Sequence, residues 1–205
     1  MKKNKTEQEL FWQGEFGEGY IERNNSDDFL KSKINLWSRM IKSIPNVSSA
    51  LELGCNIGLN LKALNSLNSK MKLKGIEINE KAANEAEKLK IAEINQGTII
   101  DSIDGGKYDL TFTVGVLIHI NPEFLKKVYD NLYNNSSKYI LINEYFNPTP
   151  ISVPYRGHEN KLFKRDFAGE LIDLYDLKLI DYGFAYSRDN HYPQDDMTWF
   201  LLEKT

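Results

Sequence analysis

Short apolar segments alternate with helical patterns along most of this sequence, and no other feature limits the possible folds as strongly. Candidate strands lie at 47–53, 73–78, 108–114 and 138–145, with helical periodicity or helix-capping residues between them. Strands separated by helices in this way pair in parallel through right-handed crossovers. The alternation therefore predicts an α/β fold with a mostly parallel sheet and helices on both faces.

Three further strands complete the predicted sheet, which then has seven. Residues 98–100 are expected to form a short strand that ends at Asp101, and the strands at 177–184 and 197–203 are expected to form an antiparallel edge. A segment with three prolines, from 146 to about 163, is longer than most connections. We predict that this segment is a functional loop.

The composition excludes several classes of protein. Lys and Arg number 26 against 29 Asp and Glu, so a net charge of −3 offers no global field for nucleic acid. No apolar run approaches the roughly 20 residues of a membrane span, and the polar amino terminus lacks the features of a secretory signal. The single cysteine, Cys55, excludes an internal disulfide framework and a Cys-based zinc site. We expect one soluble, cytoplasmic domain that binds neither nucleic acid nor membrane.

The first 45 residues are predicted to form a lid over residues 46–205, which form the core of that domain. Residues 11–24 place aromatic side chains between glycines without a steady period, which indicates an irregular or short-helical arm. Ser26 is a predicted N-cap of the next helix, which ends at Pro45. The aromatic side chains either seal a ligand site from water or fill an apolar patch on the sheet.

A glycine pair marks the turn between the first predicted strand and its helix. Glycines at Gly54 and Gly58 allow a backbone to approach a ligand closely, and the helix that follows presents unpaired N–H groups. Asn56, between them, is among the few residues that tolerate a left-handed backbone. The turn is either a cofactor site or a tight structural turn.

Acidic residues at the next strand ends favour a nucleoside site. Glu77 follows the glycine turn by about 20 residues, where a carboxylate accepts hydrogen bonds from both ribose hydroxyls. Asp101-Ser102 is expected near an adenine edge, although solvated turn residues would look the same. The spacing Gly-x-x-x-Gly differs from dinucleotide sites, and Glu52 would repel a pyrophosphate but suits the cationic amino acid end of S-adenosylmethionine.

Over residues 47–145 the chain resembles class I S-adenosylmethionine-dependent methyltransferases. The resemblance implies a Rossmann-like seven-stranded sheet with an antiparallel edge strand, and S-adenosylmethionine as cofactor. The residues that it places at the cofactor, together with the arm, are Tyr20, Arg23, Glu52, Gly54, Cys55, Asn56, Glu77, Ile78, Asp101, Ser102 and Val114.

A narrower resemblance covers nearly the whole chain. The segments at 11–24, 155–158, 163–169 and 196–204 are similar to the pseudaminic acid biosynthesis-associated methylases. This resemblance implies methylation of a hydroxyl or nitrogen on a bacterial surface-sugar precursor, such as pseudaminic or legionaminic acid or a related nucleotide sugar.

Two histidines are candidate proton acceptors. His119 follows the fourth strand, beside the expected methyl group, and the alternative is a loop histidine bonded to backbone. His158 lies in the long loop with Arg156, which is expected to pair with a carboxylate or phosphate of the sugar unless the loop is an ordinary mobile surface loop. Tyr145 and Tyr155 are the other predicted substrate-binding residues.

The sequence disfavours two other kinds of chemistry, metal binding and methylation of nucleic-acid bases. His191, Asp195 and Asp196 have no spacing that fixes a metal geometry, so we predict a solvated loop and no metal site. The residues Val114-Gly115-Val116-Leu117 replace the Asn/Asp-Pro-Pro-Tyr/Phe motif of enzymes that methylate exocyclic amines of bases, which disfavours a nucleic-acid substrate.

Three functional hypotheses follow. The first is a sugar methyltransferase, and a variant of it is a small-molecule methyltransferase with a non-sugar acceptor. The second is a module that binds S-adenosylmethionine without catalysis. The third, a dinucleotide oxidoreductase, is disfavoured by Glu52 and by the glycine spacing.

Overall fold

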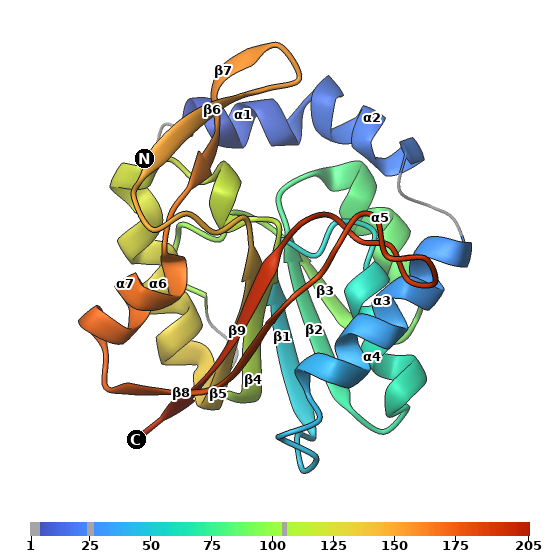
Figure 1. The fold of residues 1–205 in the computed structure, drawn as a ribbon. Helices are drawn as coiled ribbons and strands as arrows, with labels where there is room; N and C mark the ends of the chain where they lie inside the picture. Colours follow the sequence, from blue (N-terminus) through green and yellow to red (C-terminus); the bar gives the residue numbers. More distant parts are fainter. Residues whose placement is uncertain (1–4, 24–26, 104–105) are drawn as a thin grey trace.

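A computed structural model describes residues 5–23, 27–103 and 106–205 and shows one seven-stranded sheet between two layers of helices (Figure 1). The strands are β1 (Ser49–Leu53), β2 (Lys72–Glu77), β3 (Glu93–Gln96), β4 (Tyr108–Val114), β5 (Ser136–Glu144), β6 (Ile151–Tyr155), β7 (His158–Lys164), β8 (Leu177–Phe184) and β9 (Thr198–Lys204). The helices are α1 (Glu7–Gln13), α2 (Glu15–Arg23), α3 (Asp27–Met40), α4 (Leu59–Leu67), α5 (Glu80–Lys88), α6 (Leu125–Asn135) and α7 (Phe167–Leu174), with two 3₁₀ turns at Leu117–His119 and Pro122–Phe124. None of the described helices is both long and apolar enough to span a bilayer.

The strand order confirms the predicted α/β sheet. It is β3-β2-β1-β4-β5-β9-β8, with β1 to β5 parallel and β9 antiparallel to both of its neighbours, so that β9 and β8 form the antiparallel edge. The order reverses between β1 and β4. Loops at the carboxyl ends of these two strands therefore diverge and leave a crevice, where ligands bind in open parallel sheets.

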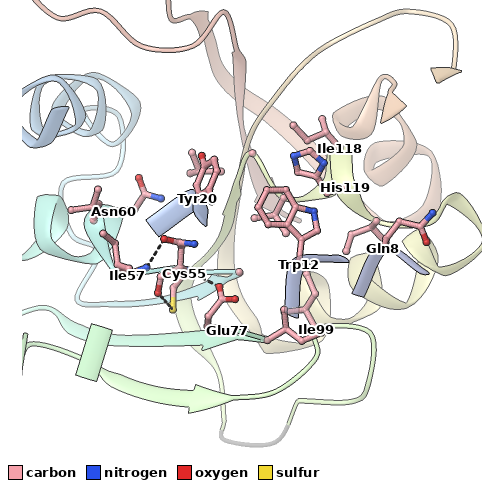
Figure 2. A pocket seen from close by; sticks show the side chains of 18 of the residues that line it. Gln8, Trp12, Tyr20, Cys55, Ile57, Asn60, Glu77, Ile99, Ile118 and His119 are labelled. Carbon is pink, nitrogen blue, oxygen red and sulfur yellow. Dashed lines mark hydrogen bonds between the residues drawn. The ribbon is translucent and has the colours of Figure 1, made fainter. Parts of the chain in front are cut away.

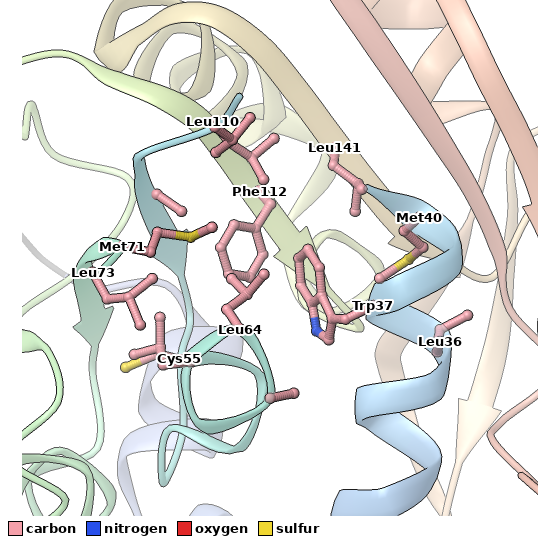
Figure 3. Packing of buried hydrophobic residues seen from close by; sticks show 14 of the residues in the cluster. Leu36, Trp37, Met40, Cys55, Leu64, Met71, Leu73, Leu110, Phe112 and Leu141 are labelled. Atoms are coloured by element: carbon pink, nitrogen blue, oxygen red, sulfur yellow. The ribbon is translucent and has the colours of Figure 1, made fainter. Parts of the chain in front are cut away.

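The central strands are buried on both faces, which explains their continuous apolar sequences. Along β1, Ala50 packs in the core layer of α3, α4 and α5, whereas Leu51 packs in the layer of α6 and α7. Trp37 of α3 lies edge-on against Phe112 of β4, with ring centroids 4.7 Å apart (Figure 3). Trp37 is therefore a core residue, as its place in the helical stripe predicts.

The prediction of a third strand at 98–100 is wrong. Strand β3 lies earlier, and its four residues pair with the second half of β2. Residues 98–100 are apolar because they pack against α6, where the side chain of Asn131 donates to the carbonyls of Ile99 and Asp101 at 2.8 and 2.7 Å. Asp101 and Ser102 consequently do not stand at a strand end.

The prediction of a long loop at 146–163 is also wrong, because most of this segment forms the hairpin β6–β7. Its two-residue turn, Arg156-Gly157, has φ values of 48° and 85°. Positive φ at both central positions is the backbone that matches the twist of a two-residue hairpin. Pro154 is tolerated within β6 because this small sheet consists of edge strands only.

The amino-terminal arm is short-helical, one of the two forms expected for it. Helix α1 begins with a capping box between Thr6 and Glu9. A Cβ atom at Gly17 would lie 1.9 Å from the carbonyl oxygen of Trp12, so the close turn from α1 to α2 requires glycine there. Both helices lie across the carboxyl ends of the strands, with the hairpin β6–β7 beside α1 (Figure 1). The predicted N-cap Ser26 lies outside the described residues.

We predict that Phe112→Ala lowers the free energy of unfolding by about 3–5 kcal/mol, because it leaves a cavity between the central strand and α3. Phe112 is fully buried, whereas Leu174 at the end of α7 is 48% exposed. Urea unfolding of both variants tests this. Leu174→Ala is the control and should cost at most about 1 kcal/mol. Equal losses in the two variants would contradict the assigned core.

Candidate functional site

A cavity lies in the crevice where the strand order reverses, beneath the amino-terminal arm (Figure 2). Its volume of about 180 Å³ gives room for several water molecules, so side chains do not fill the crevice. Its floor comes from the β1–α4 turn, the end of β2 and the segments 97–100 and 114–120. Its walls come from α1, α2, α3 and the loop before β9.

The glycine turn has the backbone that the sequence predicts. Gly54 and Gly58 have φ values of 80° and 79°, and Asn56 is left-handed at 48°. A Cβ at Gly54 would lie 2.7 Å from a methyl group of Val116, so only glycine fits between this turn and the loop after β4. The turn therefore brings unobstructed backbone to the floor of the cavity.

Glu77 joins the end of β2 to that turn. Its carboxylate accepts the backbone N–H groups of Asn56 at 2.7 Å and Asn79 at 2.8 Å. Burial raises the pKa of Glu77, and hydrogen bonds from the backbone N–H groups of Asn79, Asn56 and Ile78 oppose that rise. Because a carboxylate has about four acceptor positions and Glu77 lines the cavity, it can accept a further donor there.

A buried polar chain forms the wall at the α3 end of the cavity. Asn60 donates to the carboxylate of Glu52 at 2.6 Å and accepts from Lys33 at 3.0 Å and from Trp37 at 3.3 Å. Burial raises the pKa of Glu52 to about 8 and lowers the pKa of Lys33. Asn60 and Lys33 line the cavity, whereas Glu52 lies behind Asn60. Contrary to the prediction, Glu52 therefore does not face the cavity directly and is connected to it through Asn60.

Lys33 is a site residue that the sequence analysis missed, although a signal was present. It lies on the same helical face as Leu30 and Trp37, three residues after one and four before the other. A lysine within an apolar stripe is unusual, because a buried charge needs a partner. Asn60 carried no comparable signal.

His119 lies on the cavity wall with one ring nitrogen fixed. Its Nδ1 lies within hydrogen-bond distance of the carbonyl oxygen of Lys161 on β7. A carbonyl oxygen only accepts, so Nδ1 carries the proton and Nε2 is the basic nitrogen. Burial lowers the pKa of His119 to about 4, against the opposing effect of the Lys161 bond, and the imidazole is therefore neutral at pH 7.

The arm closes the cavity with a cluster of aromatic rings centred on Trp12. Its ring centroid lies 4.6 Å from that of His119, 5.4 Å from those of Phe16 and Tyr20, and 6.4 Å from that of Tyr155. The indole Nε1 of Trp12 and the Oε1 of Gln8 are buried and have no hydrogen-bond partner in the described part of the chain. The arm thus contributes polar atoms to the site as well as a cover.

The cavity brings together most of the predicted site residues. Those that line it are Tyr20, Gly54, Cys55, Asn56, Glu77, Ile78, Val114, His119, Tyr145 and Tyr155. Cys55 is almost fully buried, and burial raises the pKa of its thiol, which fits a packing role. The side chain of Arg23 lies outside the described residues.

Besides Glu52, four predicted residues lie away from the cavity lining. Asp101 and Ser102 follow a loop rather than a strand, as described above. Arg156 and His158 lie at the turn of the hairpin, where the ring of His158 packs 5.0 Å from Phe11 on the outside of the arm. A catalytic role for His158 does not fit this place. Among the described residues, no group of three or more His, Cys, Asp or Glu side chains is arranged to hold a metal ion.

Comparison with known proteins identifies the fold through solved structures, whereas comparison of sequences finds no match. No protein-family model matches the sequence, and no curated protein matches it. Magnesium protoporphyrin IX methyltransferase (ChlM) from Synechocystis PCC 6803, crystallised with SAH, superposes with a TM-score of 0.72 at 14% identity, covering 97% of this chain and 100% of that one. CalS10, an amino pentose methyltransferase from Micromonospora echinaspora with bound SAM, gives 0.66 at 10% identity, covering 93% and 96%. Streptomyces venezuelae DesVI gives 0.65 at 13% identity, covering 92% and 97%. The chain has the Rossmann-like fold of class I methyltransferases.

We predict that His119 titrates near pH 4 and is Nδ1-protonated at pH 7. Long-range ¹H–¹⁵N NMR distinguishes the two ring nitrogens, and the His119→Gln variant assigns the resonance. Because the pKa of His119 is lower in the folded protein than the ordinary value near 6.5, its contribution to stability is complete above pH 6.5 and is lost as the pH falls toward 4. A midpoint at or above 6.5 would contradict the buried placement.

Proposed function

We propose that this chain is an S-adenosylmethionine-dependent methyltransferase. The observation that carries the proposal is the buried carboxylate of Glu77, which faces the cavity beside a glycine turn at the point where the sheet reverses. The adjacent hydroxyls of a ribose would donate to this carboxylate. The fold and the ligands of its structural neighbours, SAM and SAH, support the same cofactor.

The walls of the cavity suit the two ends of this cofactor. Lys33 and Asn60 lie beyond the glycine turn and would contact its charged amino acid end. A pyrophosphate fits less well, because the carboxylate of Glu77 accepts from the turn itself and would lie close to the phosphates. These features favour S-adenosylmethionine over a dinucleotide.

When bound, S-adenosylmethionine supplies a methyl group on a sulfonium cation. The aromatic rings of Tyr20 and Tyr155 line the cavity and would exclude water and face that cation favourably. His119 would accept the proton of the acceptor at Nε2, with Lys161 holding the ring in the required tautomer. In this proposal α1 and α2 act as a lid over the core.

We further propose that the acceptor is a bacterial surface-sugar precursor, a nonulosonic acid or related nucleotide sugar, methylated in the cytoplasm at oxygen or nitrogen. The sequence resemblance to the pseudaminic acid biosynthesis-associated methylases supports this acceptor, and so does the amino pentose methyltransferase among the structural neighbours. Tyr145, Tyr155 and Asp195 stand on the cavity wall and would line the acceptor site. Arg156 would meet an anionic group only outside the cavity.

We predict that wild-type protein binds S-adenosylmethionine and S-adenosylhomocysteine and that Glu77→Gln weakens both by roughly 10- to 100-fold, because the ribose loses a charged acceptor. Isothermal titration calorimetry measures the effect. Glu80→Gln, at the exposed start of α5, is the matched control and should bind as wild type does. Absence of binding by the wild-type protein would refute the proposed function.

We predict that incubation with isotope-labelled cofactor transfers the label to a sugar, detected by mass spectrometry of a panel of nonulosonic acids, their nucleotide conjugates, amino sugars and non-sugar amines. His119→Gln should lower kcat by about 100-fold or more while S-adenosylhomocysteine still binds. Label only on non-sugar compounds would exclude the sugar acceptor. Cofactor binding without turnover on any compound would favour a non-catalytic module.

A further inference from the structure

Two unpartnered polar atoms stand on one face of α1 at the end of the cavity beyond Glu77. Gln8 is only 6% exposed, yet its Oε1 has no partner among the described residues, and the same holds for Nε1 of Trp12. The two residues are four apart on a helix, so their side chains are neighbours. Buried polar groups without partners are rare in folded proteins and call for an explanation. Here one is an acceptor and the other a donor, and both residues line the cavity.

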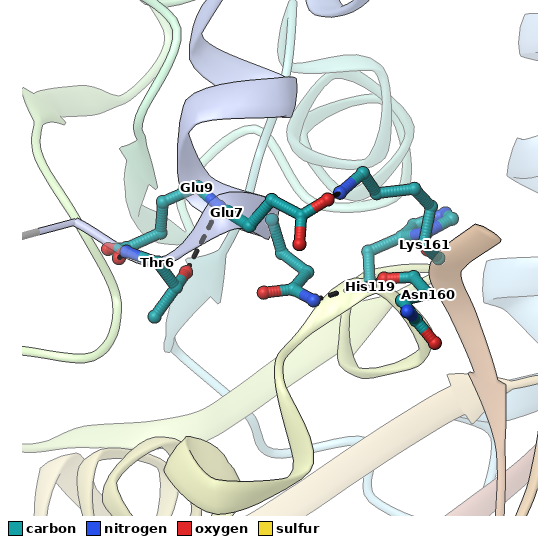
Figure 4. A network of polar contacts seen from close by, with 7 residues as sticks. Thr6, Glu7, Glu9, His119, Asn160 and Lys161 are labelled. Carbon is teal, nitrogen blue, oxygen red and sulfur yellow. Dashed lines mark hydrogen bonds and ion pairs between the residues drawn. The ribbon is translucent and has the colours of Figure 1, made fainter. Parts of the chain in front are cut away.

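The amide of Gln8 is held in one orientation. Its Nε2 donates to the carbonyl oxygen of Asn160 on β7 at 3.0 Å. A flipped amide would place two oxygens against each other, so Oε1 is the atom left for a ligand. Helix α1 is itself fixed at both sides, since Glu7 pairs with Lys161 of the hairpin (Figure 4) and, on the other side, Glu9 accepts from Thr98.

The place of these atoms along the cavity matches the base of the cofactor. Asn60 and Ile57 lie at one end of the cavity, Glu77 in the middle, and Gln8 and Trp12 with Ile99 at the other end (Figure 2). A nucleoside whose ribose is bound by Glu77 and whose amino acid end faces Asn60 must direct its base toward Gln8. The polar residues that the sequence places there, Asp101 and Ser102, do not line the cavity.

We propose that Gln8 and Trp12 of the arm recognise the adenine of the cofactor. Oε1 of Gln8 accepts from the 6-amino group, and Nε1 of Trp12 donates to an adjacent ring nitrogen. This inference rests on the proposed function and adds a specificity that the core of the fold does not supply. The hairpin β6–β7 positions these two residues, because Asn160 holds the amide of Gln8 and Lys161 holds helix α1.

S-inosylhomocysteine tests the proposal, because its base carries an oxygen where adenine carries the 6-amino group. Wild-type protein should bind it roughly 10- to 100-fold more weakly than S-adenosylhomocysteine, since two acceptors then face each other. Gln8→Leu should bind S-adenosylhomocysteine about 10-fold more weakly than wild type and should discriminate less between the two ligands, because the mismatch at the 6 position is removed. Both ratios come from calorimetry.

The matched control is Leu10→Ala, on the same helix but 58% exposed and away from the cavity lining. It should keep the wild-type ratio, whereas loss of discrimination here would assign the effect to arm docking and overturn the proposal. Equal binding of both ligands by wild type, or an unchanged ratio in Gln8→Leu, would also overturn it while leaving the proposed function intact. Failure of wild type to bind either ligand would instead refute the proposed function.

Trp12→Phe provides a second variant, which keeps an aromatic ring but removes the indole N–H together with part of the ring system. We expect it to weaken S-adenosylhomocysteine binding about 10-fold, because the base loses the N–H donor. Unchanged affinity would show that Trp12 does not recognise the base, and the Gln8→Leu result would then decide the role of Gln8.

Discussion

The structure of the site depends on the hydrogen bonds between Glu77 and the backbone of Asn56 and Asn79. They tie the glycine turn after β1 to the end of β2, the two elements that border the crevice on one side. A carboxylate that is bonded in this way stays in place despite its burial, and the carboxylate of Glu77 lines the cavity. The remaining parts of the site are arranged around this fixed point, with Lys33 and Asn60 on one side and the arm on the other.

The arm and the hairpin β6–β7 form a second layer above the sheet, and neither would be stable there alone. Helices α1 and α2 are short, with seven and nine residues, so their stability comes from packing rather than propensity. The hairpin supplies that packing through His158 against Phe11 and through the Glu7–Lys161 pair. His158 thus gains a structural role in place of the catalytic one predicted for it. The same contacts hold Gln8, Trp12 and His119 on the wall of one cavity.

Local sequence predicted those parts of the molecule that local chemistry determines. The sheet followed from alternating patterns, and the left-handed Asn56 followed from its place between two glycines. The segment 98–100 was wrongly predicted as a strand. Its apolar residues pack against α6, and a short apolar run looks the same in the sequence whether it forms a strand or packs in this way. The hairpin was missed because Arg156-Gly157 is not a common turn signal and prolines surround it. Gln8 and Asn60 were not predictable, because their roles arise only from contacts between distant segments.

His119 is held from two sides, and this bears on the chemistry it suits. Glu144 at the end of β5 accepts the backbone N–H groups of Val116 and Leu117, which caps the 3₁₀ turn that carries His119, and Lys161 holds the ring from β7. The burial that fixes the ring also lowers its pKa to about 4. A base this weak is poorly matched to a hydroxyl, which must lose its proton as the methyl group moves. A neutral amine attacks with its lone pair and can lose its proton after transfer, so its methylation depends less on His119. Within the proposed function, the dependence of catalysis on His119 therefore separates a hydroxyl acceptor from a nitrogen acceptor.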